Sequence, residues 1–273
     1  MIKFSIITIN FNNKNGLNDT IKSVFEQSFS NYEFIIIDGN STDGSKELLE
    51  IHKEKFAFAV SEPDLGIFNA MNKGIKIAKG SYLFFLNSGD CFNDELTLSN
   101  VNQLIEDKFD IYYGNLTYLN AKNSWAHWKF PNNLSLAFFI NYSLPHQGSF
   151  IKKELFETIG LYNENLKISS DWEFFLKAII INNASYKHID IIVSKYDMNG
   201  ISSNVNNENL VKSEKKLVLN NFFPLIAEDY LIIEELNSKR IKNILYIKKF
   251  KFAWKLLKGF SNILLLFLPK KSE

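Results

Sequence analysis

Short apolar runs alternate with amphipathic segments through the first 90 residues of the chain. Four runs have the length and composition of buried strands: Phe4–Ile9, Glu33–Asp38, Phe56–Val60 and Tyr82–Leu86. Between these runs, apolar residues recur at the three- and four-residue spacing of a helix face. The predicted helices lie around Leu17–Phe25, over Lys46–Lys55 and around Ile67–Ala78.

This alternating order predicts an α/β fold with a mostly parallel sheet and helices on both faces, because parallel strands are joined by helical crossovers. Ligands of such sheets bind beyond the carboxyl ends of the strands. Polar clusters follow all four predicted strands: Asn10–Asn12, Asp38–Asp43, Glu62–Asp64 and Asn87–Asp90. We expect these clusters to meet at one edge of the sheet and to form the functional site.

The second half is less regular. Strands are expected over Asp110–Leu119 and Tyr186–Tyr196, and helices near Lys153–Ile159, from Asp171 to Ile179, and over Leu210–Leu236 with a break at Pro224. Residues 123–131 are predicted to form an aromatic loop whose rings either stack on a sugar or pack on the core: Trp125, Trp128 and Phe130. The sequence has neither an internal repeat nor a Pro/Gly-rich linker. We therefore predict one domain over residues 1–238 and a tail over 239–273.

Composition narrows the class of protein. Hydrophobic residues make up 46% of the 273 residues and aromatic residues 15%, which is enough for a packed core and excludes a disordered chain. The one cysteine, Cys91, excludes a disulfide scaffold and a Cys-rich zinc site, and is expected to be a packing residue. The N-terminus has no long apolar segment typical of a signal peptide, and no run reaches the ~18 apolar residues that span a bilayer. We expect a cytoplasmic protein.

The formal charge of +1 conceals an asymmetry. Ten of the 31 basic residues and no acidic ones lie between Lys239 and Ser272, so residues 1–238 carry 21 basic and 29 acidic side chains. The basic residues Lys248, Lys251, Lys255 and Lys258 are spaced as on a helix, beside an apolar stripe: Phe250, Trp254, Leu257, Phe260, Leu264 and Leu268. This pattern favours an anionic membrane surface over nucleic acid. Packing on the body or on a partner subunit is the alternative.

Four segments together resemble glycosyltransferase family 2: SIITINFNN (5–13), EFIIIDGNSTDGS (33–45), SEPDLGIFNAMNKGI (61–75) and GSYLFFLNSGD (80–90). The resemblance covers roughly residues 4–200. It implies a GT-A fold, with a single Rossmann-like sheet flanked by helices and a C-terminal helical extension. The LNSGD ending and the GIFNAMNKG helix resemble a bacterial subgroup that builds surface polysaccharides, such as lipopolysaccharide or capsule.

The resemblance implies a metal site at Asp90. The family has an Asp-x-Asp region, often Asp-Ala-Asp-Asp, and the matching positions here are Asn87, Ser88, Gly89 and Asp90, so only the last acid is kept. The leaving nucleoside diphosphate needs a cation to stabilise its charge, and Mn²⁺ or Mg²⁺ suits oxygen ligands. The departure from the family motif favours weak metal binding. In the alternative interpretation, Asp90 only caps a turn.

Other family positions imply a nucleotide site. Asp38 would accept the uracil imide N–H, because a carboxylate only accepts hydrogen bonds. Thr8, Asn10, Asn12 and Asp64 would border the nucleotide, although each can also stabilise a turn or a loop. Lys73, on the following helix, either approaches the diphosphate or belongs to a solvated face.

Inverting transfer needs a base that takes the proton of the acceptor hydroxyl. By resemblance Asp171 fills this role, in Ser169–Glu173, although Ser170 stands where the family often has Glu. Glu173 is the less favoured base, and a simple helix-start role for Asp171 is the alternative. His146 and Gln147 would line the acceptor side, and a structural role fits His146 equally well.

The Gln-x-x-Arg-Trp motif of processive family members is missing from the sequence. We therefore expect inverting, non-processive transfer of one sugar, from a UDP-sugar to a growing, lipid-linked surface glycan. The enzyme would lie on the inner face of the cell membrane. The alternatives are a catalytically inactive nucleotide-sugar-binding module and a sugar nucleotidyltransferase, which would want a Gly-rich phosphate loop that SIITINFNN lacks.

Overall fold

The computed structural model describes residues 2–119, 124–198, 200, 204–225, 227, 236 and 238–268. By their internal contacts the residues form two compact units, Met1–Val218 and Leu219–Glu273. The boundary expected at residue 238 falls inside the second unit. Along the described part of the chain, no helix combines the length and the apolar character that crossing a bilayer requires.

The first unit is built on a sheet with the strand order β3-β2-β1-β4-β8-β6-β9-β5. Its first four strands are β1 (Phe4–Asn10), β2 (Tyr32–Asp38), β3 (Phe58–Ser61) and β4 (Tyr82–Phe85). They pair in parallel around the central β1. The predicted alternation of strands and helices is therefore confirmed for the first 90 residues.

The other strands make the sheet mixed. They are β5 (Cys91–Phe92), β6 (Ile111–Leu119), β7 (Trp125–Trp128), β8 (Ser149–Lys152) and β9 (Tyr186–Tyr196). Strand β8 is antiparallel to both β4 and β6, whereas β9 runs parallel to β6. The sheet thus keeps the predicted parallel half and joins it through β8 to a second, mixed half.

Strand β7 corrects the prediction of an aromatic loop over 123–131. Trp128 is opposite Leu116 and Trp125 is opposite Leu119, so this segment extends the sheet as a hairpin with β6. The three aromatic residues differ in exposure, since Trp125 and Trp128 are exposed whereas Phe130 is buried. Residues 120–123 lie outside the described part of the chain.

The helices are α1 (Lys14–Phe25), α2 (Ser45–His52), α3 (Ile67–Ile77), α4 (Thr97–Leu104), α5 (Leu136–Asn141), α6 (Lys153–Thr158), α7 (Ser170–Leu176) and α8 (Glu208–Phe222). Short 3₁₀ turns cover Lys53–Lys55 (η1), His146–Gly148 (η2) and Val205–Asn207 (η5), and a π turn (η3, Lys177–Ile181) ends α7. Helix α8 ends before Pro224, as predicted, whereas residues 228–235 of the predicted helix lie outside the described residues.

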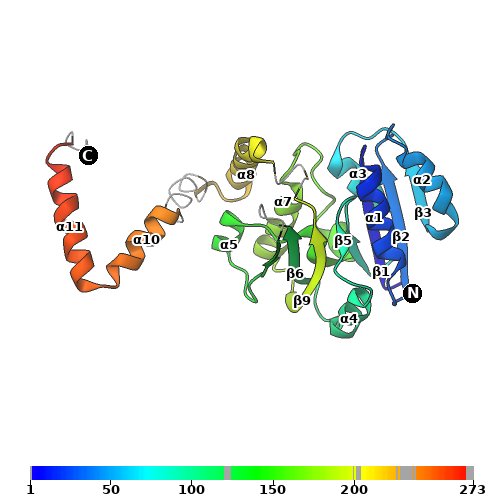
Figure 1. Ribbon diagram of the computed structural model, residues 1–273, viewed down its shortest axis with the longest axis horizontal. Helices are drawn as coiled ribbons and strands as arrows, with labels where there is room; N and C mark the ends of the chain where they lie inside the picture. The colour runs from blue at the N-terminus through cyan, green and yellow to red at the C-terminus, as the bar shows by residue number, and fades with distance from the viewer. Residues whose placement is uncertain are drawn as a thin grey trace. The chain divides into compact units, whose positions relative to one another are not determined.

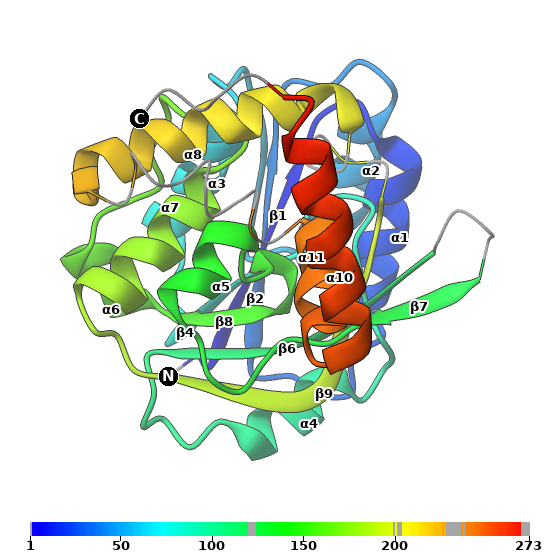
Figure 2. The ribbon, with the colours of Figure 1, turned by 90° about the vertical axis from the view of Figure 1, so that its left-hand side faces the viewer.

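Alternate residues of β1 face opposite layers, as strand geometry requires. Ile6 packs in the core cluster with Leu17 and Ile21 of α1. Ile7 faces α3, where a methyl group added to Gly74 would lie 2.5 Å from its Cγ2. Helices α1 and α3 therefore cover opposite faces of the sheet (Figure 2).

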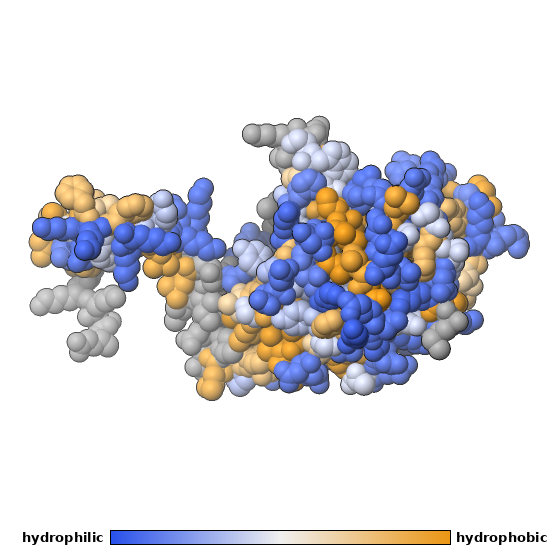
Figure 3. Space-filling model, turned by 90° about the horizontal axis from the view of Figure 1, so that it is seen from below, coloured by the Kyte–Doolittle hydropathy of each residue, from blue (hydrophilic) through white to orange (hydrophobic). Residues whose placement is uncertain are grey.

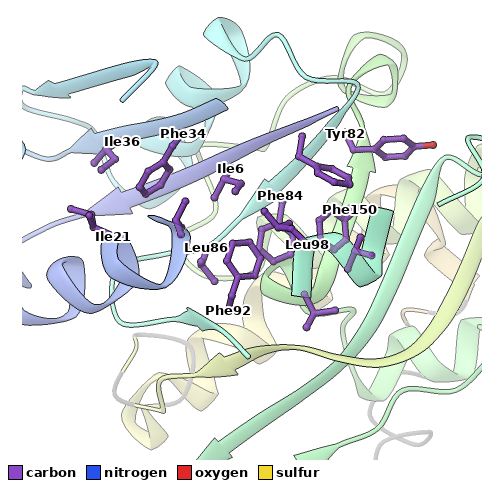
Figure 4. Packing of buried hydrophobic residues seen from close by; sticks show 14 of the residues in the cluster. Ile6, Ile21, Phe34, Ile36, Tyr82, Phe84, Leu86, Phe92, Leu98 and Phe150 are labelled. Atoms are coloured by element: carbon purple, nitrogen blue, oxygen red, sulfur yellow. The ribbon is translucent and has the colours of Figure 1, made fainter. Parts of the chain in front are cut away.

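The core continues from the parallel half of the sheet into the mixed half (Figure 4). Phe84 of β4 stacks on Phe150 of β8 with ring centroids 4.4 Å apart, and on Phe92 of β5 at 5.2 Å. Burying such side chains stabilises the fold by about 2 kcal/mol each. This packing fixes β4, and with it the polar loop that follows β4.

The second unit contains α10 (Lys239–Lys248) and α11 (Lys251–Leu265), drawn as separate helices in Figure 1. The predicted helical C-terminal extension is confirmed. The helical spacing predicted for Lys248–Lys258 does not belong to one continuous helix, because α10 ends at Lys248 and α11 begins at Lys251. The break comes at Lys249 and Phe250, and Phe250 has an extended backbone.

Candidate active site

The polar residues expected at one edge of the sheet do lie together there. Asn10 is opposite Asp38 in the parallel register of β1 and β2. The loop after β4 joins them, because the N–H of Ser88 donates to the carbonyl of Ile9 at 3.1 Å. The carboxyl ends of three neighbouring strands thus form one polar region.

The carboxylate of Asp38 is fully buried and organises this region. Its Oδ1 accepts from Asn10 Nδ2 at 2.6 Å and from Ser41 Oγ at 2.5 Å. Its Oδ2 accepts from the Ser41 N–H at 2.9 Å and from Ser61 Oγ at 2.5 Å. A nucleoside bound by this carboxylate would have to share or replace one of these four donors.

Thr8 and Asn12 hold the neighbouring backbone. Thr8 is fully buried and donates to the carbonyl of Leu86 at 2.6 Å, which ties β1 to the end of β4. Asn12 has a left-handed backbone with φ of 50°, and its Oδ1 accepts from the Thr42 N–H at 2.9 Å. Both side chains therefore shape the polar region, and direct contact with a nucleotide stays a prediction for them.

An exposed aromatic ring, which the sequence pattern did not single out, lies beside Asp64. A methyl group added to Gly39 would lie 2.6 Å from Asp64 Oδ2 and 3.1 Å from Phe11 Cδ2. Phe11 is 67% exposed, although it follows a buried strand. Its position inside an Asn-rich loop was the available signal, since a large apolar residue there has no core to fill.

Lys73 is engaged by the loop that holds Asp64. Its Nζ lies 2.6 Å from Glu62 Oε1 and donates to the carbonyl of Pro63 at 3.1 Å. These contacts connect α3 to the loop after β3. Contact between Lys73 and a diphosphate stays a prediction.

The loop Asn87–Asp90 is fixed by Thr20, a buried residue of α1. The Thr20 hydroxyl donates to the carbonyl of Asp90 at 2.7 Å and accepts from the Gly89 N–H at 3.0 Å. Gly89 has φ of 104°, a backbone conformation that favours glycine. The loop conformation thus depends on two residues that are not themselves candidates for chemistry.

Asp90 is 4% exposed, and its Oδ1 accepts from the Asp197 N–H at 2.8 Å. Burial raises the pKa of Asp90 to about 7, the hydrogen bond from the Asp197 N–H opposes this rise, and the charge of Asp197 adds to it. The carboxylate of Asp197 lies over the same loop, because a methyl group added to Gly89 would be 2.7 Å from its Oδ2. Sequence reasoning missed Asp197, which is far from the Asn87–Asp90 loop along the chain.

The carboxylate oxygens of Asp90 and Asp197 are the kind of ligand that a hard divalent cation prefers. Among the residues that the structure describes, no three His, Cys, Asp or Glu groups form a metal cluster. Asp90 and Asp197 nevertheless present two neighbouring carboxylates at the end of a strand. One or two carboxylates suffice for Mg²⁺, which usually keeps several waters.

Asp171 and His146 come together at the first turn of α7. Asp171 Oδ2 lies 3.2 Å from His146 Nδ1, and its Oδ1 accepts from the Trp172 N–H at 2.7 Å. On the other side of the ring, His146 Nε2 lies 3.0 Å from Asn87 Nδ2. The imidazole therefore connects the expected base with the loop expected to hold a metal.

Two other residues of this region, Glu173 and Gln147, take part in structural hydrogen bonds. Glu173 is buried and accepts from Asn163 Nδ2 at 3.0 Å, an arrangement that stabilises the loop before α7. Gln147 is buried, and its backbone carbonyl accepts from Ser194 Oγ at 2.5 Å. Cys91 is half-buried, and burial raises its thiol pKa to about 11, as is typical of a packing residue.

Comparison with known proteins now gives the family. The family described as "Glycosyl transferase family 2" matches residues 5–160, which is more than half of the chain. The chain belongs to glycosyl transferase family 2. The matched segment includes the Asn87–Asp90 loop and the residues predicted to border the nucleotide.

Curated relatives of this glycosyltransferase carry the same kind of name. An uncharacterized glycosyltransferase of Mycobacterium tuberculosis is 32% identical over 202 residues, covering 73% of this chain and 76% of the relative. A PGL/p-HBAD biosynthesis glycosyltransferase of Mycobacterium bovis is 26% identical, covering 77% of this chain and 82% of the relative.

Solved structures share the GT-A fold of this family 2 enzyme. S. aureus TarS, residues 1–349, in complex with UDP-GlcNAc has a TM-score of 0.63 at 19% identity, covering 87% of this chain and 67% of that one. The chain spans 42% of the longer TarS chain. A mannosyltransferase from Pyrobaculum calidifontis in complex with GDP-Man and Mn²⁺ has a TM-score of 0.55 at 14% identity, covering 96% and 80%. At these identities the likeness shows the fold.

Proposed function

We propose that this glycosyltransferase moves one sugar from a UDP-sugar to a hydroxyl of a lipid-linked surface glycan, with inversion and without processive addition. One observation carries the proposal: the carboxylate of Asp171 contacts one ring nitrogen of His146, and the other ring nitrogen contacts Asn87 in the loop after β4. Activation of the acceptor hydroxyl requires a base, and Asp171 would supply it. Stabilisation of the leaving group requires positive charge nearby, which a cation held by carboxylates at the strand end would supply.

The donor would bind at the carboxyl ends of β1 and β2. The TarS complex with UDP-GlcNAc supports a UDP-sugar. The exposed ring of Phe11 next to Asp64 suits stacking on a planar base, and Asp38 offers a carboxylate matched to an imide N–H. Asn10, Thr8 and the loop of Asn12 would hold these groups in place.

A divalent cation would be held by Asp90 and Asp197. Bound there, Mn²⁺ or Mg²⁺ supplies positive charge that stabilises a departing diphosphate. The protein's part is to hold two carboxylates together on a loop fixed by Thr20 and by the left-handed Gly89. The raised pKa of Asp90 also fits a site whose carboxylate is ionised fully only when a cation is near.

Asp171 would accept the proton of the acceptor hydroxyl as that oxygen attacks the anomeric carbon. The bond to the diphosphate breaks on the opposite side of the sugar, so the configuration is inverted. Direct displacement of this kind needs one base and no covalent sugar–enzyme intermediate. The position of Asp171 at the start of α7, partly exposed and held by His146, suits this role.

The test measures UDP release and UDP binding with a panel of UDP-sugars and glycolipid acceptors. Asp171→Asn should bind UDP with unchanged affinity and lose transfer by about 10²- to 10⁴-fold, the range for a general base. Asp90→Asn should weaken metal-dependent donor binding. Asp107→Asn, an exposed carboxylate paired with Lys3, is the matched control and should behave as the wild type.

The same test separates the alternatives. Tight UDP binding without transfer to any acceptor would favour an inactive nucleotide-sugar-binding module. Release of pyrophosphate from UTP and a sugar phosphate would favour a nucleotidyltransferase. Full transfer by Asp171→Asn would remove Asp171 from the role of base.

The acceptor and the location belong to the same proposal. The basic and apolar helices α10 and α11 would hold the enzyme on the inner face of the cell membrane, where lipid-linked glycans are extended. Figure 3 shows hydrophobic and hydrophilic side chains next to one another on these helices. Such a surface suits the boundary between lipid headgroups and acyl chains.

A further inference from the structure

The imidazole of His146 is held between one acceptor and one donor. Its Nδ1 lies 3.2 Å from Asp171 Oδ2, and its Nε2 lies 3.0 Å from Asn87 Nδ2. The side chains of His146 and Asp171 are only 16% and 18% exposed, so water competes little for these contacts. The three residues come from the η2 turn, from α7 and from the loop after β4.

The partners decide which ring nitrogen carries the proton. An ionised carboxylate only accepts hydrogen bonds, so Nδ1 must carry the hydrogen that faces Asp171. In a neutral ring Nε2 is then an acceptor and requires a donor. The amide N–H of Asn87 is that donor. If the amide oxygen and nitrogen of Asn87 were exchanged, the amide oxygen would face the unprotonated Nε2, and neither of these two atoms could donate a hydrogen bond.

The oxygen of Asn87 does not determine the orientation of the amide. Asn87 Oδ1 is buried and has no hydrogen-bond partner within the described ranges of the chain. The side chain is therefore not oriented by a bond of its oxygen. Its visible contact is the donation to His146, and an aspartate at this position, as in the usual family motif, could not make that donation to a neutral ring.

We propose that Asn87 and His146 are positioning residues for the base: Asn87 fixes the Nδ1–H tautomer of His146, which in turn orients Asp171. The inference rests on the proposed function, in which Asp171 is the base. It gives a physical reason for an amide in place of an acid at the start of the metal loop. Asn87 then serves the acceptor side of the reaction.

The tautomer is measured by nitrogen NMR of the full chain with labelled histidine. The chain has four histidines, and loss of one signal set in His146→Asn assigns the ring. We expect a pyrrole-type Nδ1 and a pyridine-type Nε2. In Asn87→Asp, the carboxylate accepts, so both nitrogens should become pyrrole-type at the same pH. A pyrrole-type Nε2 in the wild type, or an unchanged ring in Asn87→Asp, would overturn the proposal.

The second measurement compares the kcat of variants in which asparagine or glutamine replaces His146. The amide nitrogen of asparagine can replace Nδ1, whereas that of glutamine reaches toward the position of Nε2. His146→Ala should lower kcat about 10- to 100-fold, as expected for loss of an orienting partner, with little change in the donor KM. His146→Asn should recover most of kcat and His146→Gln should not. Equal activity of the two would overturn the positioning role.

Failure of the proposed function gives a different result. If Asp171→Asn transfers sugar normally while the wild-type ring shows the expected tautomer, then the base is wrong and the hydrogen-bond assignment stands. If Asp171→Asn is inactive while the tautomer is reversed, then the base stands and the positioning inference fails.

Discussion

At the scale of single residues, the buried hydroxyl of Thr20 holds the Asn87–Asp90 loop in its conformation. It donates to the Asp90 carbonyl and accepts from the Gly89 N–H, so it fixes two of the loop's four residues from a neighbouring helix. Neither contact could be read from the spacing of Thr20 along α1. The hydroxyl should therefore matter for stability as well as for binding of a cation.

Thr20→Val keeps the shape of the side chain and removes its hydrogen bonds. It leaves the Gly89 N–H and the Asp90 carbonyl with fewer partners, which should lower the free energy of unfolding by about 1–3 kcal/mol. Thr158→Val, at an exposed position of α6, is the matched control and should change stability by less than about 0.5 kcal/mol. Urea unfolding measures the stability of both variants. Equal stability would contradict the role of the Thr20 hydroxyl in holding the loop.

A second single residue, His188, should make stability depend on pH. Burial lowers the pKa of His188 from 6.5, and Asp190 opposes this shift in part. The unfolded chain therefore binds more protons just below pH 6.5, so this residue should reduce stability as the pH falls through that range. In His188→Gln the loss between pH 7.5 and 5.5 should be smaller. The exposed His127→Gln control should lose as much as the wild type, and identical losses in all three proteins would contradict the prediction.

At the scale of elements, the parallel strands β1, β2 and β4 were predictable because they are buried on both faces. Strands such as Phe4–Asn10 and Tyr32–Asp38 then appear as continuous apolar runs. Strand β5 has only two residues and β7 depends on pairing with β6, so neither has a signal of its own. The Asn87–Asp90 loop followed from the family motif. Its contact with Asp197 did not, because 107 residues separate Asp90 from Asp197.

Glu214 of α8 likewise makes contacts that the sequence pattern does not reveal, because its partners lie far away along the chain. Its buried carboxylate accepts from three successive backbone N–H groups at 2.6, 3.1 and 2.9 Å: those of Lys167, Ile168 and Ser169. Lys215 adds a cation–π contact with Trp172, 5.0 Å from the ring centroid. Helix α8 thus anchors the segment that leads into α7 and Asp171. The sequence marked Glu214 only as one polar residue on a long helix.

Glu214→Gln should lower the free energy of unfolding by about 1.5–3 kcal/mol, because the amide cannot replace a carboxylate that accepts three bonds. Transfer should fall as well, since Asp171 lies at the end of the anchored segment. Glu208→Gln, on the same helix, is the matched control. Its pair with Lys212 is exposed and should contribute less than about 0.5 kcal/mol. Chemical unfolding and UDP release measure the two effects, and equal behaviour of both variants would contradict the anchor.

At the scale of the whole molecule, opposite charges are separated along the chain. The acidic residues belong to 1–238, apart from Glu273, whereas the last 35 residues hold ten basic side chains. On α11 and just after it, five large apolar side chains recur at helical spacing and are 57–81% exposed: Phe252, Leu256, Phe260, Ile263 and Phe267. Trp254 and Leu257 of the predicted stripe are half-exposed, whereas its other four members are 47–60% exposed: Phe250, Phe260, Leu264 and Leu268.

A membrane role for this tail predicts that charge and apolar area contribute separately to vesicle binding. Each basic residue near an anionic surface is worth about 1 kcal/mol, so replacing Lys251, Lys255 and Lys258 by Gln should weaken binding to phosphatidylserine vesicles by about two orders of magnitude. Binding of the wild type should also weaken at high salt, because exposed charges are screened. Leu256→Ser with Phe260→Ser should weaken binding to anionic and neutral vesicles alike.

The matched control replaces three exposed lysines of the body, Lys22, Lys53 and Lys55, by Gln. It carries the same charge change and should bind vesicles like the wild type, because the attraction depends on where the charges lie and not on their sum. Sedimentation with vesicles at low and high salt measures all four proteins. If the tail variants and the body variant bind equally, the membrane role fails. A change in oligomeric state of the Leu256→Ser, Phe260→Ser variant would instead favour packing of α11 on a partner subunit.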